Sequence, residues 1–448
     1  MNSSSQVSIQ MGKRIGRIVL AGVGCIFLLG SIGVAGCEVT PSVDKNLNDA
    51  HPRLSTRDKG GDRKHAETTI PAHLLAGYQY VHNAAFRRRT LETSLVNHQN
   101  GYARIRLENY TEDKWGSLKI LRPRYRPIRP GDLGKGVPKA DNTWQRLDTE
   151  NTRWTDASLR QLGEAMFTGY PAQLERSIYN VLNDSENPRQ YGLWQTAESV
   201  GGLIWVELPG GVYPSLTCAT CHATANEKGK LIYGLPNHNI DIGKMQDDAR
   251  SQRTLKSHWG PGRVDISPDR LDNPIVIPDL RAVAFEKYLH RTANVKNSPE
   301  ALAVRLETGL ILVSNRSVRP PRVAIFALSH FVTGLGKTLP PIPESEGRVV
   351  FNAHCATCHN GVALSGAPVP VDDLHDDSAI ANSPIRTTGF MQNTSLRGVS
   401  GRRRLLSNGM VEGFEDLLRA DRAAYGHYFG QNLLSDEKQK LIAFLKQL

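Results

Sequence analysis

Cysteine is scarce in this chain, and acidic residues are absent from its beginning. Only 6 of its 448 residues are Cys, too few and too unevenly placed for a disulfide scaffold. With 39% hydrophobic and 22% charged residues, the composition also excludes a disordered, collagen-like or coiled-coil protein. At roughly 100–200 residues per domain, the length predicts several domains whose cores need no disulfides. The cysteines are Cys25, Cys37, Cys218, Cys221, Cys355 and Cys358.

Residues 1–37 contain no Asp or Glu, and basic residues at 13–17 precede an apolar stretch over 18–35. This is the pattern of a secretory signal peptide, although the stretch is also long enough to serve as an uncleaved membrane anchor. It ends in Val-Ala-Gly-Cys37, which resembles the lipobox of bacterial lipoproteins; the alternative is a plain signal peptide. We expect an exported protein, lipid-anchored at Cys37, on the periplasmic face or outer membrane of a bacterium. Cys25 has no evident role.

The next two regions differ in their apolar pattern. Residues 38–69 lack apolar periodicity and predict a flexible tether. Residues 70–195 predict a helical region, because apolar residues recur at helical spacing. These residues are Leu159, Leu162, Met166, Leu174, Ile178 and Leu182. A basic, Pro-rich strip at 119–139 forbids a long helix. It is either a docking patch for an acidic partner or an anionic lipid surface, or a solvated loop. Export argues against nucleic acid as a partner.

One five-residue motif occurs twice, at 218–222 and 355–359, as Cys-Ala-Thr-Cys-His. C-x-x-C-H is the attachment signature of c-type haem, and two chance copies are not credible with so few cysteines. A redox C-x-x-C pair or half of a zinc site would not explain the histidine in both copies. We therefore expect two covalently bound haem c groups. They would be attached through Cys218, Cys221, Cys355 and Cys358, with His222 and His359 as iron ligands.

The sixth ligand of each iron decides the function class, because an open or displaceable position can bind an oxidant. For the second haem, the loop before a C-terminal helix capped by Ser435 offers His427 as first choice. Met410 is the second choice for this ligand. Tyr425, or a position without a protein ligand, is the remaining alternative. For the first haem, His238 lies in a loop rich in Gly and Pro.

His238 is otherwise a solvent-exposed histidine. The remaining histidines, among them His258, His290 and His330, are expected to be structural.

Residues 200–448 resemble the bacterial dihaem cytochrome c peroxidase superfamily, with its relatives the dihaem maturation enzymes and the rubber oxygenases. The likeness lies in four stretches: 393–399, 405–409, 415–418 and Gly426-His427. It implies a mainly α fold of two cytochrome-c-like helical domains, residues 196–345 and 346–448, each with one covalent haem.

Trp259 matches the tryptophan that relays electrons between the haems of the peroxidases. The alternative is a tryptophan packed beside the porphyrin edge.

The sequence departs from that family in three respects. The distal Glu of the peroxidases has only Glu286 and Asp279 as candidates, Ser407 replaces a histidine, and residues 70–200 have no counterpart. We expect a peroxidase-like oxidoreductase whose second haem passes electrons to the first. A small cytochrome or similar donor would supply the electrons, and a small oxidant would receive them. The alternatives are a membrane-tethered electron carrier with two six-coordinate haems, and an oxygenase acting on an apolar substrate.

Overall fold

The computed structural model describes most of the chain beyond residue 70. The described ranges are 71–111, 113–150, 152–249, 256–266, 271–375, 378–422 and 426–448. The predicted signal peptide, its lipobox Cys37, Cys25 and the tether lie outside the described residues. Among the helices that are described, none combines the length and apolar character needed to cross a membrane.

The fold mixes helices with small sheets, so the prediction of a mainly α protein with two cytochrome-c-like helical domains is wrong. Helices hold 41% of the described residues and strands hold 13%. The largest sheet has four strands in the order β2-β4-β5-β3, all antiparallel. Sequence periodicity missed the strands because most span only two or three residues, too short to show an alternating pattern.

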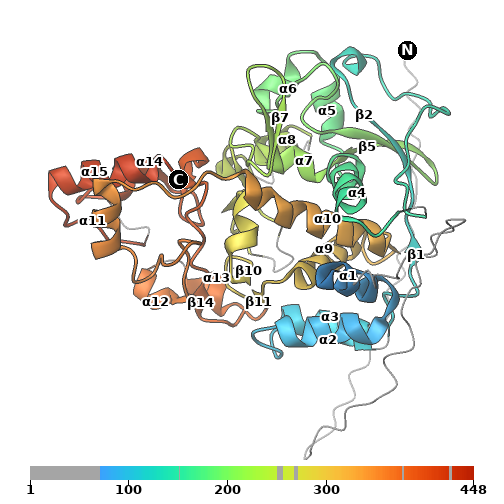
Figure 1. Ribbon diagram of the computed structural model, residues 1–448. Helices are drawn as coiled ribbons and strands as arrows, with labels where there is room; N and C mark the ends of the chain where they lie inside the picture. Colours follow the sequence, from blue (N-terminus) through green and yellow to red (C-terminus); the bar gives the residue numbers. More distant parts are fainter. Residues whose placement is uncertain are drawn as a thin grey trace, which may run out of the picture. The chain divides into compact units, whose positions relative to one another are not determined.

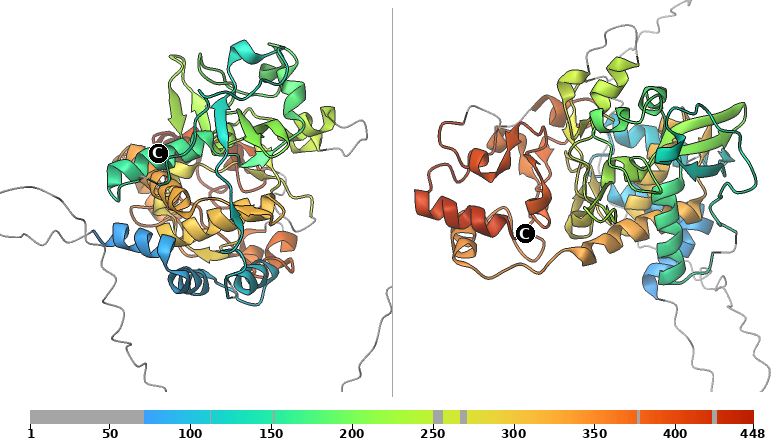
Figure 2. Two further views of the ribbon diagram at one scale, coloured as in Figure 1. Left: turned by 90° about the vertical axis from the view of Figure 1, so that its right-hand side faces the viewer. Right: turned by 90° about the horizontal axis from the view of Figure 1, so that it is seen from above.

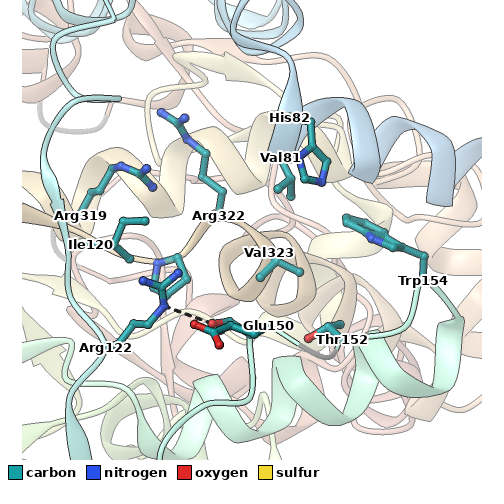
Figure 3. Close-up of a pocket in the computed structure, with 12 residues that line it drawn as sticks. Val81, His82, Ile120, Arg122, Glu150, Thr152, Trp154, Arg319, Arg322 and Val323 are labelled. Carbon is teal, nitrogen blue, oxygen red and sulfur yellow. Dashed lines mark hydrogen bonds between the residues drawn. The ribbon is translucent and has the colours of Figure 1, made fainter. Parts of the chain in front are cut away.

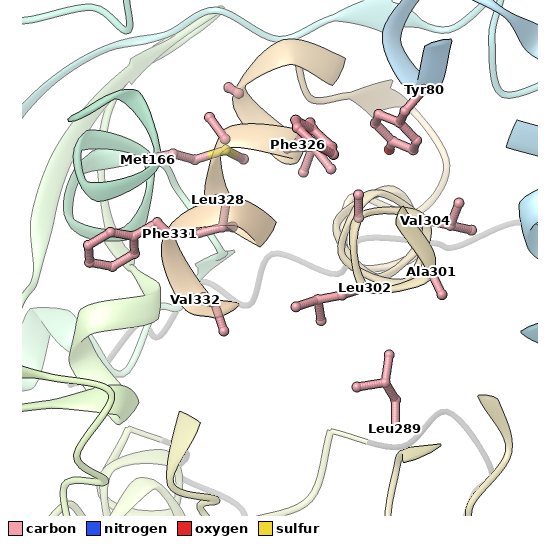
Figure 4. Packing of buried hydrophobic residues seen from close by; sticks show 14 of the residues in the cluster. Tyr80, Met166, Leu289, Ala301, Leu302, Val304, Phe326, Leu328, Phe331 and Val332 are labelled. Atoms are coloured by element: carbon pink, nitrogen blue, oxygen red, sulfur yellow. The ribbon is translucent and has the colours of Figure 1, made fainter. Parts of the chain in front are cut away.

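Figure 1 shows α9 and α10 at the middle of the described chain, with α4 and α1 packed against α10. These helices share one apolar core, drawn in Figure 4, which includes Tyr80, Met166 and Phe326. The helices of this core are α1 (Ala72–His82), α2 (Ala84–Ser94), α3 (Gly101–Thr111), α4 (Asp156–Gly169), α9 (Pro299–Val313) and α10 (Arg322–Gly334). Because this core draws on residues from Leu74 to Leu335, the region before the first motif packs together with the region that follows it. Two short helices, α5 (Ile178–Leu182) and α6 (Asn187–Gln190), come after α4, and α5 packs in a second apolar cluster.

The helical spacing was correct for α4 and for Ile178 and Leu182, which are buried in the short helix α5, but it was wrong for Leu174. Leu159, Leu162 and Met166 are buried on one face of α4, and the Thr155 hydroxyl caps its first turn by accepting from the Ser158 amide at 3.2 Å. Leu174 instead lies in a strand and is 48% exposed. The helix predicted after Pro171 is therefore limited to the five residues of α5.

The strip at 119–139 forms strands and one 3-10 turn. Arg124 pairs with Glu207 at 2.5 Å, and Arg126 with Asp132 at 2.8 Å. The strip's strands are β1 (Lys119–Ile120) and β2 (Arg124–Pro127), and its turn is η2 (Pro130–Asp132). The other strands of the four-stranded sheet are β3 (Gln173–Leu174), β4 (Ile204–Leu208) and β5 (Gly211–Leu216). Part of the strip's positive charge is therefore neutralised within the fold.

Short elements surround the first motif. They are α7 (Cys218–His222), β6 (Ala223–Ala225), β7 (Leu231–Tyr233), α8 (Ile242–Asp248), η3 (Ser257–Trp259), β8 (Arg263–Val264), β9 (Ile275–Val276), η4 (Leu280–Phe285), β10 (Tyr288–Leu289), β11 (Val295–Lys296), β12 (Val318–Arg319) and η5 (Leu335–Thr338). Glycine-rich turns join them. Many of the glycines in these turns have a positive φ, a conformation that other residues seldom adopt.

The C-terminal elements gather on one side of the described chain, as the orange and red ribbons of Figures 1 and 2 show. They are α11 (Glu346–His354), β13 (Val369–Pro370), α12 (Val371–Leu374), α13 (Ser378–Asn382), β14 (Phe390–Met391), η6 (Val399–Gly401), β15 (Arg404–Leu405), β16 (Val411–Glu412), α14 (Gly413–Leu417) and α15 (Ser435–Leu445). The rings of Phe351 and Phe444, 5.3 Å apart, join α11 to α15. Leu434, rather than Ser435, is the N-cap of α15.

Candidate functional site

The first motif forms one helical turn, α7, between β5 and β6. Its middle residues Ala219 and Thr220 are buried. The hydroxyls of Thr217 and Thr220 both donate to the Gly202 carbonyl oxygen, at 2.7 and 3.3 Å. Gly202 has a φ of +68°, and a Cβ there would lie 2.9 Å from the Thr220 nitrogen. The alanine and threonine of the motif thus fix α7 against a turn that requires glycine.

The His222 ring is held through one nitrogen. Its Nδ1 lies 3.1 Å from the carbonyl oxygen of Pro278. A hydrogen on Nδ1 satisfies this carbonyl and leaves the lone pair of Nε2 for a metal, which is how metal-binding imidazoles are usually oriented. Burial lowers the pKa of His222 to about 4, so the ring is neutral near pH 7.

The second motif lies in a turn that continues from α11 rather than in a helix of its own. The segment beginning at Asn393, one of those that resemble the peroxidase superfamily, holds this turn in place. The Asn393 side chain donates to the Cys358 carbonyl, and the Ser395 hydroxyl donates to the Ala363 carbonyl at 2.6 Å. Arg397 donates to the Val362 carbonyl at 3.1 Å. The loop after the motif is thus fastened by three side chains of one segment.

His359 repeats the arrangement of His222 in different surroundings. Its Nδ1 lies 3.3 Å from the carbonyl oxygen of Leu364. Burial, with a smaller contribution from His427, lowers the pKa of His359 to about 4. Both motif histidines are therefore neutral, and the Nδ1 atom of each contacts a backbone carbonyl. The surroundings differ, because His222 forms part of α7 whereas His359 lies in the turn after α11.

A second imidazole faces His359. The ring centres of His359 and His427 lie 6.3 Å apart, with 53° between the ring planes. Metal–imidazole bonds are about 2 Å long, and a ring centre lies about 1 Å behind its nitrogen, so one metal between two imidazoles needs centres about 6 Å apart. This spacing would allow both imidazoles to bind one metal ion between them.

The backbone conformation of His427 is strained. Its φ is +52°, in the left-handed region that non-glycine residues seldom adopt. Its amide donates to the Leu374 carbonyl at 2.8 Å, and its own carbonyl accepts from Arg422 Nη2 at 2.9 Å. Its Nδ1 is buried and has no hydrogen-bond partner among the described residues. A strained residue held from both sides is typical of functional sites.

Arg422 is a buried cation next to this histidine. It is 6% exposed, and its Nη2 donates to the carbonyls of Gly426 and His427. Its Nε and Nη1 have no hydrogen-bond partner within the described ranges. A buried guanidinium with two unsatisfied donors suits an anionic group, such as the propionates that a haem carries. Sequence reasoning missed this residue, because one arginine among 55 basic residues carries no signal.

Met410, the alternative ligand, is placed differently. It is 42% exposed, and its Sδ lies 3.5 Å from Arg263 Nη1. The structure therefore brings His427 to His359 and leaves Met410 at the surface. Tyr425 lies outside the described residues.

The candidate sixth ligand of the first iron, His238, contacts the C-terminal part of the chain. Its Nε2 lies 2.6 Å from the carbonyl oxygen of Gly401. In the described part of the chain no ring contact joins His238 to His222. His238 remains a prediction, and it could bind that iron only after leaving Gly401.

Trp259 packs in the apolar cluster beside the first motif. It is 2% exposed and belongs to the same apolar cluster as Cys221. Its Nε1 donates to Asp272 at 2.8 Å. Four residues further on, Arg263 donates to the Asn408 carbonyl at 3.1 Å. The predicted relay therefore sits in a loop that reaches from the first motif's cluster to the C-terminal segment.

The two candidate acids differ in their partners. Asp279 is buried and paired with Arg281 at 2.6 Å. Glu286 accepts from the Gln392 side chain at 2.8 Å, and burial raises its pKa. Of the two, Glu286 is better suited to carry a proton, since its environment favours the protonated form.

The motif thiols form no disulfide, and the surroundings of three of them disfavour the thiolate. All four are free and half-buried. Burial raises the pKa of Cys218 and Cys355 to about 11 and that of Cys221 to about 12. Thiol–disulfide exchange requires the thiolate, which a raised pKa disfavours. The environment therefore argues against a redox C-x-x-C pair.

A separate cavity of about 280 Å³ lies beside α1, β1 and the start of α10, shown in Figure 3. None of the motif residues lines it. Its charged walls come from Arg122, Arg319, Arg322 and Glu150. Arg322 is already paired with the buried Glu307 at 2.9 Å, so much of this charge is committed to the fold.

No known protein family, curated protein or solved structure matches this chain. Its class is therefore inferred from the two motifs and from the geometry around them.

Proposed function

We propose that this chain is an exported dihaem c-type redox protein. The observation that carries the proposal is the pair His359 and His427, whose rings lie at the spacing of two axial ligands on one iron. The shared Nδ1–carbonyl contact of His222 and His359 supports it further. Haem iron held by such ligands supplies reversible one-electron chemistry.

The residues give the two centres different roles. His359 and His427 would both bind the second iron, so this centre would only pass electrons. His238, the expected sixth ligand of the first iron, contacts the Gly401 carbonyl at 2.6 Å, which supports a first centre able to meet a small oxidant. Electrons would then pass from the second centre to the first, with Trp259 as the relay, as in a peroxidase-like oxidoreductase.

The partners follow from these roles. A small cytochrome or a similar donor would reduce the second centre, and a small oxidant would take electrons from the first. Residues 1–37 would direct export, and lipidation at Cys37 would keep the protein at a bacterial membrane facing the periplasm.

Electron paramagnetic resonance of the fully oxidised and half-reduced protein, together with peroxide turnover, tests this proposal. We expect one low-spin centre from the second motif, a high-spin component from the first after half-reduction, and peroxide consumption. Only low-spin iron in both states, without turnover, would instead indicate an electron carrier with two six-coordinate haems.

A further inference from the structure

Two histidines and an aspartate meet at the surface where α1, α4 and α10 pack together. They are His73 on α1, Asp156 at the first position of α4, and His330 on α10. None of these residues belongs to the haem motifs or to their expected ligands. We propose that they form a binding site for one divalent transition metal ion of the zinc type.

The ligand atoms are already close to the positions that such an ion requires. His73 Nε2 lies 2.8 Å from Asp156 Oδ1, and His330 Nε2 lies 3.3 Å from the same oxygen. All three ligand atoms lie within 4.8 Å of one another. A tetrahedral ion with bonds of about 2.1 Å needs its ligand atoms about 3.4 Å apart, so only small adjustments are needed.

The packing of the three helices holds the site together. α10 packs against both α4 and α1, and the two imidazole rings are nearly parallel, with 5° between their planes and centres 5.8 Å apart. Burial lowers the pKa of His330, which favours the neutral form that binds metals. Side-chain exposures of 45%, 65% and 23% leave room for a water molecule as fourth ligand.

The ligand types select the ion. Two imidazoles and one carboxylate suit zinc and its transition-metal neighbours, whereas calcium and magnesium require oxygen ligands. The nearby cations Lys337 and Arg160 weaken the attraction for any dication, so the two nitrogen ligands must supply most of the affinity. The bound ion would join α1 to the pair of helices that carries the core.

Zinc titration of the full-length, haem-containing protein against a fluorescent zinc chelator tests the site. The key variant is Asp156→Asn, which keeps an oxygen that can accept from His73 but removes the charge. A cluster that only joins helices through hydrogen bonds would tolerate it. The double variant His73→Ala/His330→Ala removes both nitrogen ligands.

A matched control exists at His258, which pairs with Asp272 at 2.8 Å and has similar exposure but belongs to no three-residue group among the described residues. We expect the double variant to lose one equivalent of zinc, Asp156→Asn to bind it at least about 10-fold more weakly, and His258→Ala to match the unaltered protein. Calcium and magnesium should not compete. Equal zinc stoichiometry and affinity in all four proteins would overturn the proposal. Circular dichroism without zinc checks that each variant is folded.

Discussion

The imidazole of His427 faces the imidazole of His359 at a centre-to-centre distance of 6.3 Å, although the two residues are far apart in the sequence. Their approach depends on the backbone around His427, which is held between the Leu374 carbonyl and Arg422. The positive φ of His427 shows that the chain accepts strain to keep this ring in place.

Replacing His427 with alanine should convert the second haem from low-spin to high-spin, because the iron loses one of two strong axial ligands. Met410→Ala should leave both haems as they are, since Met410 is at the surface beside Arg263. Electron paramagnetic resonance and visible spectra of the oxidised variants measure the difference. If Met410→Ala alone produces high-spin iron, methionine is the ligand and the facing imidazoles are incidental.

Replacing the cysteines of one motif at a time should remove one haem at a time. We expect Cys218→Ala/Cys221→Ala to keep only the haem of the second motif, and Cys355→Ala/Cys358→Ala to keep only that of the first. Haem content per chain should therefore fall by half in each double variant, as measured by the pyridine haemochrome spectrum. The reading would be contradicted if either double variant kept its full haem content.

His290 should make the protein less stable at acidic pH. Burial, followed by the charges of Arg305, Arg386 and Arg106, lowers its pKa well below 6.5. The unfolded chain takes up this proton below about pH 6.5, while the folded protein does not, so stability falls as the pH falls. By pH 5 the loss attributable to His290 amounts to at most about 2 kcal/mol.

Urea unfolding at pH 7.5 and 5 tests this expectation. His290→Gln should lose less stability over this interval than the unaltered protein. His98→Gln, at an exposed histidine, should behave like the unaltered protein. An identical pH dependence in all three proteins would mean that His290 does not stay neutral in the folded state.

Phe444→Ala should destabilise the part of the chain that carries the second motif. The Phe444 ring is fully buried and packs against Phe351 on α11, the helix that leads into this motif. Truncating such a ring costs about 3–5 kcal/mol. Phe390→Ala, at a ring that is 41% exposed, should cost much less. Chemical denaturation of both variants would show comparable losses if the α11–α15 contact were unimportant.

Local signals in the sequence predicted some elements well. Leu159, Leu162 and Met166 predicted α4 because a long amphipathic helix repeats its apolar face several times. The same reasoning failed at Leu174, where a two-residue strand pairs with β5. Strands of two or three residues are too short to show an alternating pattern, so the mixed character of the fold could not be predicted from periodicity.

Residues of the candidate site could be predicted from the sequence where haem attachment requires a fixed spacing of cysteines and histidine. C-x-x-C-H is such a case, and the loop before the C-terminal helix offered His427. Arg422 and the group of His73, Asp156 and His330 could not be predicted, because only the folded chain brings these residues to their partners. The carbonyls that hold His222 and His359 are backbone atoms, which no sequence pattern reveals.

Mass spectrometry of the protein made in a bacterium that attaches c-type haem tests the central claim most directly. We expect a mature chain heavier by two haem groups, with one haem on the peptide containing Cys218 and Cys221 and one on the peptide containing Cys355 and Cys358. Four unmodified cysteines in a folded, exported chain would contradict it.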